Sequence, residues 1–490
     1  MNTLPLTLLV PALGAALVAL QGRRPNLREA ISLATAALLF ALVTSLYPAV
    51  MAAAESGAWP RALLAEPLPG LPLLLEVEPL GLLFATVASG LWIVTTVYAI
   101  GYMRGADEKH QTRFFVCFAV AIAAAMGIAF AGNLLTLFIF YEALTLSTWP
   151  LVTHKGNDAA KRGGRIYLGI LLSTSIGFLL IAIIWTYAAT GTLEFRPGGI
   201  LAGKVEGGAL VALLALYMFG IGKAALMPFH RWLPAAMVAP TPVSALLHAV
   251  AVVKAGVFSV LKVAVYVFGI DLLADSGANL PIMWLAAFSL IVASLVAMGK
   301  DNLKARLAYS TVAQLAYVVL GAMLATDLGI IGGSFQIAMH AMGKITLFFC
   351  AGAIYVAAHK TEISQMDGLG RQMPLTFAAF FIGALSIIGL PPLGGSWAKW
   401  YLLLGAIEVQ QLAMVAALMI SSLLNIAYLM PLVARGFLLP TPGESRIHPA
   451  PLHEAPLACV VPLCLTAVGC LILFLKADAL LALVQLIPLR

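Results

Sequence analysis

Long apolar runs, separated by short polar stretches, follow one another along nearly the whole chain of 490 residues. A bilayer core about 30 Å thick takes about 20 apolar residues per helix, and on that measure the sequence predicts fourteen spans. They are expected, to within a few residues, at 4–21, 30–53, 78–101, 114–131, 133–152, 166–188, 209–228, 241–268, 281–299, 305–325, 330–358, 373–403, 407–434 and 455–477. The pattern therefore predicts an all-α polytopic membrane protein.

Composition supports this class and excludes a soluble enzyme. Hydrophobic residues make up 62% of the chain and charged residues 10%, which leaves too little polar surface to solvate a globular domain of this size. The longest connections, at 54–77, 189–208 and 435–454, are too short for an independent core. We expect no cofactor in this chain, so any flavin or iron-sulfur chemistry would come from partners.

Lysine and arginine gather in alternate loops, as they do on the cytoplasmic side of membrane proteins. One side holds eighteen of the twenty-eight: Arg23, Arg24, Arg28, Arg104, Lys109, Arg113, Lys155, Lys161, Arg162, Arg165, Arg231, Lys300, Lys304, Arg306, Lys360, Arg371, Arg435 and Arg446. The other side holds five: Arg61, Arg196, Lys204, Lys476 and Arg490. Both termini are therefore expected on the outer face of a bacterial cytoplasmic membrane, and the net charge of +7 needs no nucleic-acid partner.

Two further features limit the interpretation. The basic residues beside the first span follow its apolar run, which is the wrong order for a signal peptide, so we expect this helix to be retained. The five cysteines fall within apolar spans without CxxC spacing, so we expect small buried hydrophobes and no metal site. They are Cys117, Cys350, Cys459, Cys464 and Cys470.

Six charged residues remain inside the expected spans. They are Glu142, Lys223, Lys254, Lys262, Lys344 and Lys399. A charge at bilayer depth is costly, so such residues pair, become neutral or line a water-filled path, and six of them indicate proton or ion translocation. Two structural alternatives stay open: Glu142 and Lys223 can form a pair that only joins two helices, and Lys262 can snorkel to the outer interface. Burial lowers the pKa of a lysine toward the physiological range, which suits a proton relay.

Histidines accompany three of these lysines. His340 and Lys344 are four residues apart and share a helix face. His230 follows Lys223 by seven residues, and His248 precedes Lys254 by six. Because imidazole can take a proton at one nitrogen and release it at the other, we expect these histidines to relay protons or to connect the lysines.

Prolines interrupt two of the spans beside buried lysines. Pro228 follows Lys223 by five residues, and Pro391 and Pro392 precede Lys399 by eight and seven. Paired interrupted helices point to inverted repeats and a midplane path. We therefore predict two five-helix repeats, spans four to eight (113–270) and nine to thirteen (271–436), between an N-terminal part (1–112) and a C-terminal part (437–490). Span eight, with VAPTPVSALL at its start and Gly256 after Lys254, is a candidate for a further interruption.

These motifs resemble the antiporter-like subunits of respiratory complex I, Mrp cation/proton antiporters and membrane-bound hydrogenases. The resemblance covers essentially the whole chain and is strongest in MPFHRWLPAAMVAPTPVSALLHAVAVVKAGVF at 227–258. It is supported by FYEALTLS, KDNLKARLAYSTVAQLAYV, MHAMGKITLFF and GLPPLGGSWAKW. It implies fourteen helices with two inverted repeats and a central hydrophilic axis. It also implies that Glu142 pairs with Lys223, that the path continues through His248, Lys254, His340 and Lys344, and that Lys399 is the exit-side lysine.

The parent complex is predicted from smaller differences. Lysine at 399 disfavours the complex I subunit that has glutamate there, and the short tail after the last span is unlike the largest complex I and Mrp subunits. The chain looks most like the D-type subunit of Mrp antiporters, which implies hydrophobic partner subunits and Na⁺/H⁺ exchange. Two alternatives remain: a proton-pumping subunit of a redox complex, and a membrane subunit that couples protons to a soluble partner such as a carbon-uptake protein. Ala235 stands where the family often has an acidic residue after WLP, so proton uptake through that carboxylate is in doubt.

Overall fold

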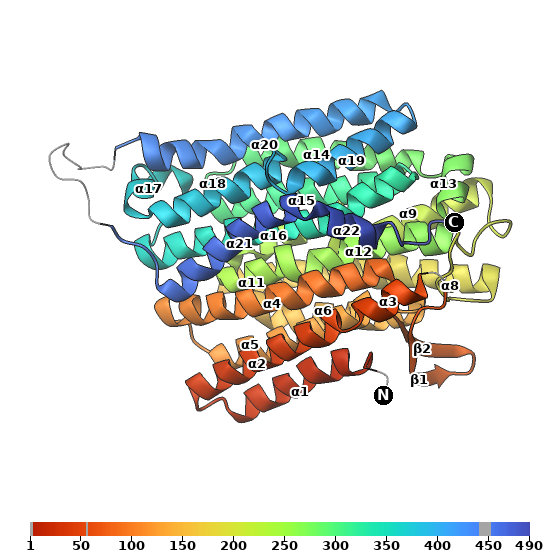
Figure 1. The fold of residues 1–490 in the computed structure, drawn as a ribbon, viewed down its shortest axis with the longest axis horizontal. Helices are drawn as coiled ribbons and strands as arrows, with labels where there is room; N and C mark the ends of the chain where they lie inside the picture. Colours follow the sequence, from red (N-terminus) through yellow and green to blue (C-terminus); the bar gives the residue numbers. More distant parts are fainter. Residues whose placement is uncertain (1–2, 55–56, 441–451) are drawn as a thin grey trace.

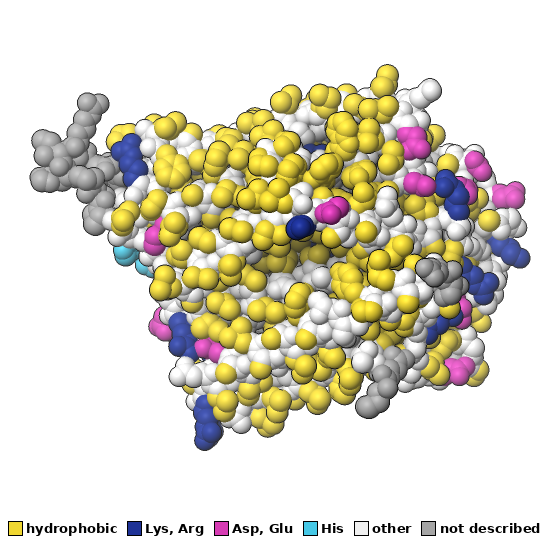
Figure 2. Space-filling model, in the orientation of Figure 1, with side chains coloured by type: hydrophobic (Ala, Val, Ile, Leu, Met, Phe, Trp, Pro, Cys, Tyr) yellow, Lys and Arg dark blue, Asp and Glu magenta, His cyan; other side chains and the backbone are white. Residues whose placement is uncertain are grey.

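The computed structural model describes residues 3–54, 57–440 and 452–490, so Arg446 of the basic loops lies outside the described residues. Its helices run side by side along the long axis of the molecule (Figure 1). On the face drawn in Figure 2, hydrophobic side chains cover most of the middle, and most charged side chains lie toward the left and right ends. This is the surface of a multi-pass integral membrane protein, in which helices satisfy their backbone groups internally and expose apolar side chains to lipid.

Each expected span coincides with a helix or with a run of adjoining helical segments. The first helices are α1 (Leu6–Leu20), α2 (Pro25–Thr44), α3 (Tyr47–Ala53), α4 (Pro79–Gly105), α5 (Gln111–Ala129) and α6 (Leu134–Val152). They are followed by α7 (Asp158–Thr174), η1 (Ser175–Leu179), α8 (Leu180–Thr190), α9 (Gly207–Gly220), η2 (Gly222–Ala224), α10 (Trp232–Ala235) and η3 (Ala236–Val238). Next come α11 (Thr241–Ala245), η4 (Leu246–Val250), α12 (Val252–Val263), η5 (Ala264–Phe268) and α13 (Ile270–Ser276).

The second half of the chain continues in the same way. It contains α14 (Leu280–Met298), α15 (Leu303–Met323), α16 (Asp327–Ala358), η6 (Ile363–Gln365), α17 (Leu369–Gln372) and α18 (Pro374–Ile388). It ends with α19 (Gly395–Glu408), α20 (Leu412–Leu438), α21 (Leu457–Leu475) and α22 (Ala477–Val484). Within the described residues, ten helices are long and apolar enough to cross a membrane, and α1, α9 and α18 are shorter apolar helices. Helix α18 ends at Ile388, close to the interruption expected at Pro391, whereas α9 ends at Gly220, before the one expected at Pro228.

One connection that was expected to be a loop forms a β-hairpin. Strands β1 (Arg61–Leu68) and β2 (Leu71–Glu76) pair antiparallel, so the described residues are not entirely helical. The tight turn between them uses Gly70, whose φ of +76° is readily adopted only by glycine. Pairing satisfies the backbone groups of this apolar stretch, and Leu75 adds a bridge to Ala131 at the end of α5. Figure 1 places the hairpin at the end of the bundle where α1 begins and the chain ends.

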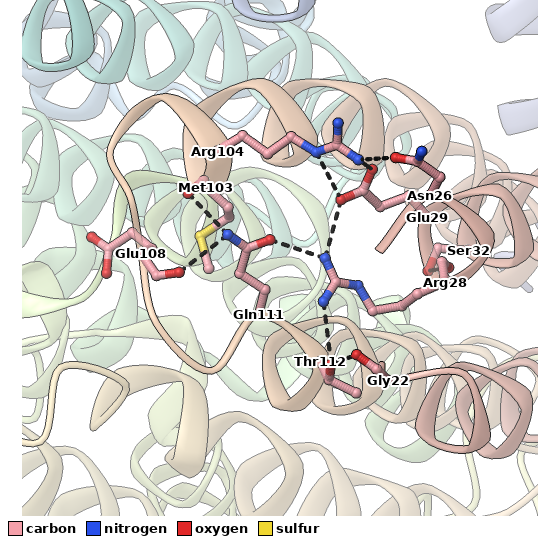
Figure 3. A network of polar contacts seen from close by, with 10 residues as sticks. All are labelled: Gly22, Asn26, Arg28, Glu29, Ser32, Met103, Arg104, Glu108, Gln111 and Thr112. Atoms are coloured by element: carbon pink, nitrogen blue, oxygen red, sulfur yellow. Dashed lines mark hydrogen bonds and ion pairs between the residues drawn. The ribbon is translucent and has the colours of Figure 1, made fainter. Parts of the chain in front are cut away.

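A partly buried polar network joins the turn between α1 and α2 to the turn between α4 and α5 (Figure 3), at the opposite end of the bundle from the hairpin (Figure 1). Arg28, expected in a loop, lies in α2 with 4% of its surface exposed. Its guanidinium donates to Glu29 at 3.1 Å, Gln111 at 2.9 Å and Thr112 at 3.2 Å. Arg104 at the end of α4 also binds the Glu29 carboxylate. Because these residues come from α2, α4 and α5, the network fixes the N-terminal helices against the rest of the molecule.

Candidate functional site: a row of buried lysines

Lys223 lies where α9 stops and the chain turns. After Gly220 the backbone leaves the helix for a single 3-10 turn, and Gly222 packs so closely on α7 that a Cβ there would lie 2.3 Å from the Thr174 hydroxyl. The turn buries Lys223 completely. Its Nζ donates to the Tyr141 carbonyl at 2.8 Å and to Thr145 at 2.6 Å, and it lies 3.2 Å from the centre of the Tyr141 ring.

Glu142 lies on the same helix, α6, but does not make the direct contact expected for it. Among the described residues no ion pair joins its carboxylate to Lys223; the lysine contacts Tyr141 and Thr145 instead. Both carboxylate oxygens of Glu142 are buried without a hydrogen-bond partner in the described part of the chain. Such atoms are where ordered water binds, so the expected coupling between Glu142 and Lys223 would act through water or through space.

Lys254 meets a histidine from another helix. Its Nζ lies 2.6 Å from Nδ1 of His340, which joins α12 to α16. The nearest histidine in the sequence, His248, contacts no lysine by hydrogen bond in the described residues; both its ring nitrogens are buried and unpartnered. Nε2 of His340 is also unpartnered. The fold therefore selects His340 as the direct partner of Lys254, whereas His248 packs against the Phe348 ring and has no hydrogen-bond partner in the described residues.

Lys344, one turn beyond His340, is hydrogen-bonded to the first of two linked hydroxyl groups. Its Nζ donates to Ser310 at 2.7 Å, and Ser310 also accepts from the Tyr428 hydroxyl at 2.8 Å. Tyr428 in turn contacts the Asn425 side chain. Sequence reasoning missed these three residues, although each is a polar group within an apolar span, which was the available signal.

Lys399 lies beside the second interruption. Its Nζ donates to the carbonyl of Ile388, the last residue of α18, at 2.6 Å and to Ser422 at 2.8 Å. Gly389 makes this possible, because it has a φ of +90° and a Cβ there would lie 2.6 Å from the lysine stem. Only 7% of Lys399 is exposed, and it borders a mostly apolar cavity of about 400 Å³ between α19 and α20.

Three expected residues have other surroundings. His230 is half-buried, packs 6.1 Å from the Tyr309 ring, and makes no hydrogen bond to Lys223 in the described residues. Lys262 does not snorkel: it is 1% exposed and pairs with Glu78 at 3.3 Å. Glu78 was missed as a second buried acid because it opens the third span, where it caps α4 by accepting from the backbone N–H groups of Leu80 and Gly81.

The cysteines take no part in this site. All five are free; Cys350, Cys459 and Cys470 are buried, and Cys117 and Cys464 are partly buried. The described residues contain no group of three or more histidine, cysteine, aspartate or glutamate side chains placed to hold a metal ion.

Lys223, Lys254, Lys344 and Lys399 thus each contact a neighbouring segment of the bundle. Known proteins are similar to this chain in sequence and in fold. The family described as NADH:quinone oxidoreductase/Mrp antiporter, TM matches residues 131–425. The chain belongs to this family. NADH-quinone oxidoreductase subunit N of Desulforudis audaxviator is 32% identical over 413 residues, 81% of each chain. Hydrogenase-4 component B of Escherichia coli K12 is 32% identical over 347 residues, which cover 67% of this chain and 50% of that protein.

Solved structures share the fold of this antiporter-like subunit. A chain of the Mrp complex from Dietzia sp. DQ12-45-1b superposes with a TM-score of 0.86 at 23% identity, covering 99% of this chain and 96% of that chain. A chain of the membrane-bound sulfane sulfur reductase, an archaeal respiratory membrane complex, gives a TM-score of 0.86 at 22% identity, covering 100% and 97%. The protein is therefore an antiporter-like membrane subunit of the proton-translocating family that Mrp, complex I and hydrogenase assemblies share.

Proposed function

We propose that this chain is the proton-translocating subunit of an Mrp-type Na⁺/H⁺ antiporter and works in a complex of hydrophobic subunits. In this proposal the chain spans the bacterial cytoplasmic membrane fourteen times, with both termini outside. Residues 113–270 and 271–436 are two inverted five-helix repeats. The observation that carries the proposal is the burial of Lys223, Lys254, Lys344 and Lys399, each of which contacts neutral groups of a neighbouring segment and none of which contacts a carboxylate in the described residues.

The relay proceeds from one buried amine to the next. Lys223 gives up its proton toward α12, where Lys254 and His340 share one at 2.6 Å. From His340 the proton passes to Lys344, one turn along α16, and then by way of the hydroxyls of Ser310 and Tyr428 toward Lys399. Waters at the unpartnered atoms of Glu142, His248 and His340 bridge the gaps, as buried waters do elsewhere.

The surfaces at the two ends of this series support a need for partners. On α6 the face that carries Glu142 also exposes Ile139, Leu146 and Trp149. At the other end, Trp400 and Leu423 are 54% and 66% exposed beside the cavity at Lys399. Lipid tails offer no polar group to a carboxylate or an amine at such a face, whereas a neighbouring subunit does.

A second function is favoured by a separate observation. The relatives with clear sequence identity named above are subunits of a quinone oxidoreductase and of a hydrogenase. The same lysines would then serve a redox-driven pump, and sodium would play no part in the cycle.

Substitution of the relay residues tests the proposal. In everted vesicles that carry the native complex, we expect Lys223→Ala and Lys254→Ala to assemble normally but to lower proton flux at least about a hundredfold, as loss of an essential proton-transfer group does. Glu142→Gln should cause a similar loss. The control is Lys161→Ala on the exposed side of α7, which should leave flux unchanged. Full flux in either lysine variant would refute the relay.

A further inference from the structure

Two cavities adjoin at the end of the bundle that carries most basic residues, the end proposed as cytoplasmic. The outer cavity, about 470 Å³, lies between the α4–α5 turn and the loop after α6, and Glu108 and His154 line it. The inner cavity, about 150 Å³, is bordered by α4, α11, α15 and α16, and Thr241 and Lys304 line it. Lys155 lines both. The two cavities therefore lie next to each other, on either side of Lys155.

Glu108 and His154 are an acid and a base that lie close together, largely buried, in the wall of the outer cavity. The Glu108 side chain is 13% exposed and the His154 side chain 2%, with 4.0 Å between Oε2 and Nε2. Burial raises the pKa of Glu108, and the nearby ammonium groups of Lys155 and Lys304 limit that rise. Burial lowers the pKa of His154 to about 4, so its imidazole stays neutral. Both its ring nitrogens lack a hydrogen-bond partner among the described residues, which leaves a place for bridging water.

Other charged groups surround this pair. Arg113 on α5 donates to the His154 carbonyl at 2.9 Å. Asp107, Lys109 and His110 of the α4–α5 turn also border the outer cavity. Together with Lys155 and Lys304, these groups make the surroundings mostly positive. Asp107 is exposed, so Glu108 is the carboxylate inside the cavity that can attract a proton.

The inner cavity lies at the start of the helical segment that carries His248. Thr241 lines the cavity, and Ser244 and His248 follow it by three and seven residues along α11 and η4, so the three lie about one turn apart in succession. Ser244 and His248 are fully buried, and their side-chain polar atoms have no partner in the described residues. Ala351 also lines the cavity, and one turn away Phe348 packs 4.7 Å from the His248 ring. Unpartnered polar atoms in such a row are typical sites of buried water.

We propose that Glu108 collects protons from the aqueous side and that water in the two cavities passes them by Thr241 and Ser244 to His248. The Glu108 carboxylate takes a proton from bulk water and releases it to cavity water, which restores the carboxylate. A proton then leaves the water chain for one ring nitrogen of His248, while the other nitrogen can release its proton toward the lysines. This path gives Glu108 the uptake role that Ala235 cannot fill, and it rests on the proposed relay because it ends there.

The test compares charge-removing variants of the whole complex in everted vesicles that are loaded with NaCl and diluted into sodium-free medium, so that sodium leaving the vesicles draws protons in from the medium at the cytoplasmic face. The initial rate of proton uptake is followed over a range of pH. Glu108→Gln should lower the initial rate about tenfold at about pH 8 and less at about pH 6, because a collecting group matters most when protons are scarce. The matched control is Asp158→Asn, which removes an exposed carboxylate on the same side and should leave the rate and its pH dependence unchanged. Ser244→Ala removes one unpartnered oxygen, so it should assemble normally and slow flux severalfold at every pH.

The outcomes separate this path from the relay itself. Glu108→Gln behaving like Asp158→Asn, while Lys254→Ala is inactive, would overturn the collecting role and leave the relay standing. If Glu108→Gln fails to assemble, Ser244→Ala decides, and wild-type flux in that variant would overturn the path. Full flux in Lys254→Ala, or no sodium-driven flux in the wild type, would remove the proposed function and this path together.

Discussion

The buried lysines differ in the partners that hold them, and the difference distinguishes the proposed relay lysines from Lys262. Lys223, Lys344 and Lys399 donate to backbone carbonyls and hydroxyl groups, and Lys254 meets an imidazole. Neutral acceptors like these do not fix the ammonium form, so the amine can lose its proton. A carboxylate partner stabilises the charged form instead. Lys262, which pairs with Glu78, is therefore a structural residue by its contacts.

Removal of one partner from the Lys262–Glu78 pair should destabilise the protein. Lys262→Met leaves the Glu78 carboxylate buried at 2% exposure without its counter-charge, which costs about 3–5 kcal/mol. Glu78→Gln should also destabilise, although the amide oxygen can still cap α4, and the double variant should recover most of the loss. Thermal denaturation of the solubilised complex measures this, with Lys204→Met in an exposed loop as the control. Equal stability of Lys262→Met and Lys204→Met would contradict the structural role.

At the scale of single elements, the sequence located the helices and their two breaks but not their cross-links. A proline without an N–H group interrupts a transmembrane helix, so Pro391 predicted the end of α18 at Ile388 to within a few residues. Pro228 marked the region of the other break, but α9 already ends at Gly220, eight residues earlier. The partners of the lysines were not, because Ser310 and Tyr428 are 118 residues apart and Lys262 and Glu78 184 apart. The hairpin was missed because a short apolar stretch with prolines resembles a loop. Whether the two halves are inverted repeats stays a prediction.

Span eight does contain an irregular segment, but it lies before Lys254 and not at Gly256, which instead makes a packing contact. The helix α12 runs through Gly256, and the irregular turn lies earlier, in the π-helical segment η4. Gly256 is small because α12 touches the Lys223 turn: a Cβ there would lie 2.3 Å from the backbone nitrogen of Ala224. This contact joins the break that carries Lys223 to the helix that carries Lys254.

A single methyl group at this contact should impair both stability and transport. Gly256→Ala should push α12 away from the Lys223 turn and cost about 1–3 kcal/mol, as overpacking in cores does. We expect a lower melting temperature of the complex and a lower proton flux per assembled complex. The control is Gly169→Ala, since nothing lies within 4 Å of a Cβ at that glycine of α7. If the two variants have the same melting temperature and the same proton flux, the close packing at Gly256 matters for neither stability nor transport.

At the scale of the whole molecule, the lysine series crosses the bundle sideways instead of following one helix. It passes from α6 to the Lys223 turn, through Gly256 to α12, through His340 to α16, and then to α15 and α20 before it reaches Lys399 on α19. Glu142, on the helix that contacts Lys223, and Lys399, the last lysine, lie near apolar outer faces of the bundle. A path with this course fits a subunit that exchanges charge with neighbours on both sides.

The identity of those neighbours decides which ion or reaction drives the protons. We expect mass spectrometry of the complex that co-purifies with this chain from its native membrane to find small, wholly hydrophobic partners without flavin, iron-sulfur clusters or nickel. Vesicles with that complex should then lose an imposed pH gradient when sodium is added, and Lys254→Ala vesicles should keep it. Partners with redox cofactors, together with proton pumping that needs a reductant and ignores sodium, would contradict the antiporter assignment. The lysine relay would survive that result, because its contacts lie within this chain, but the source of its energy would be electron transfer.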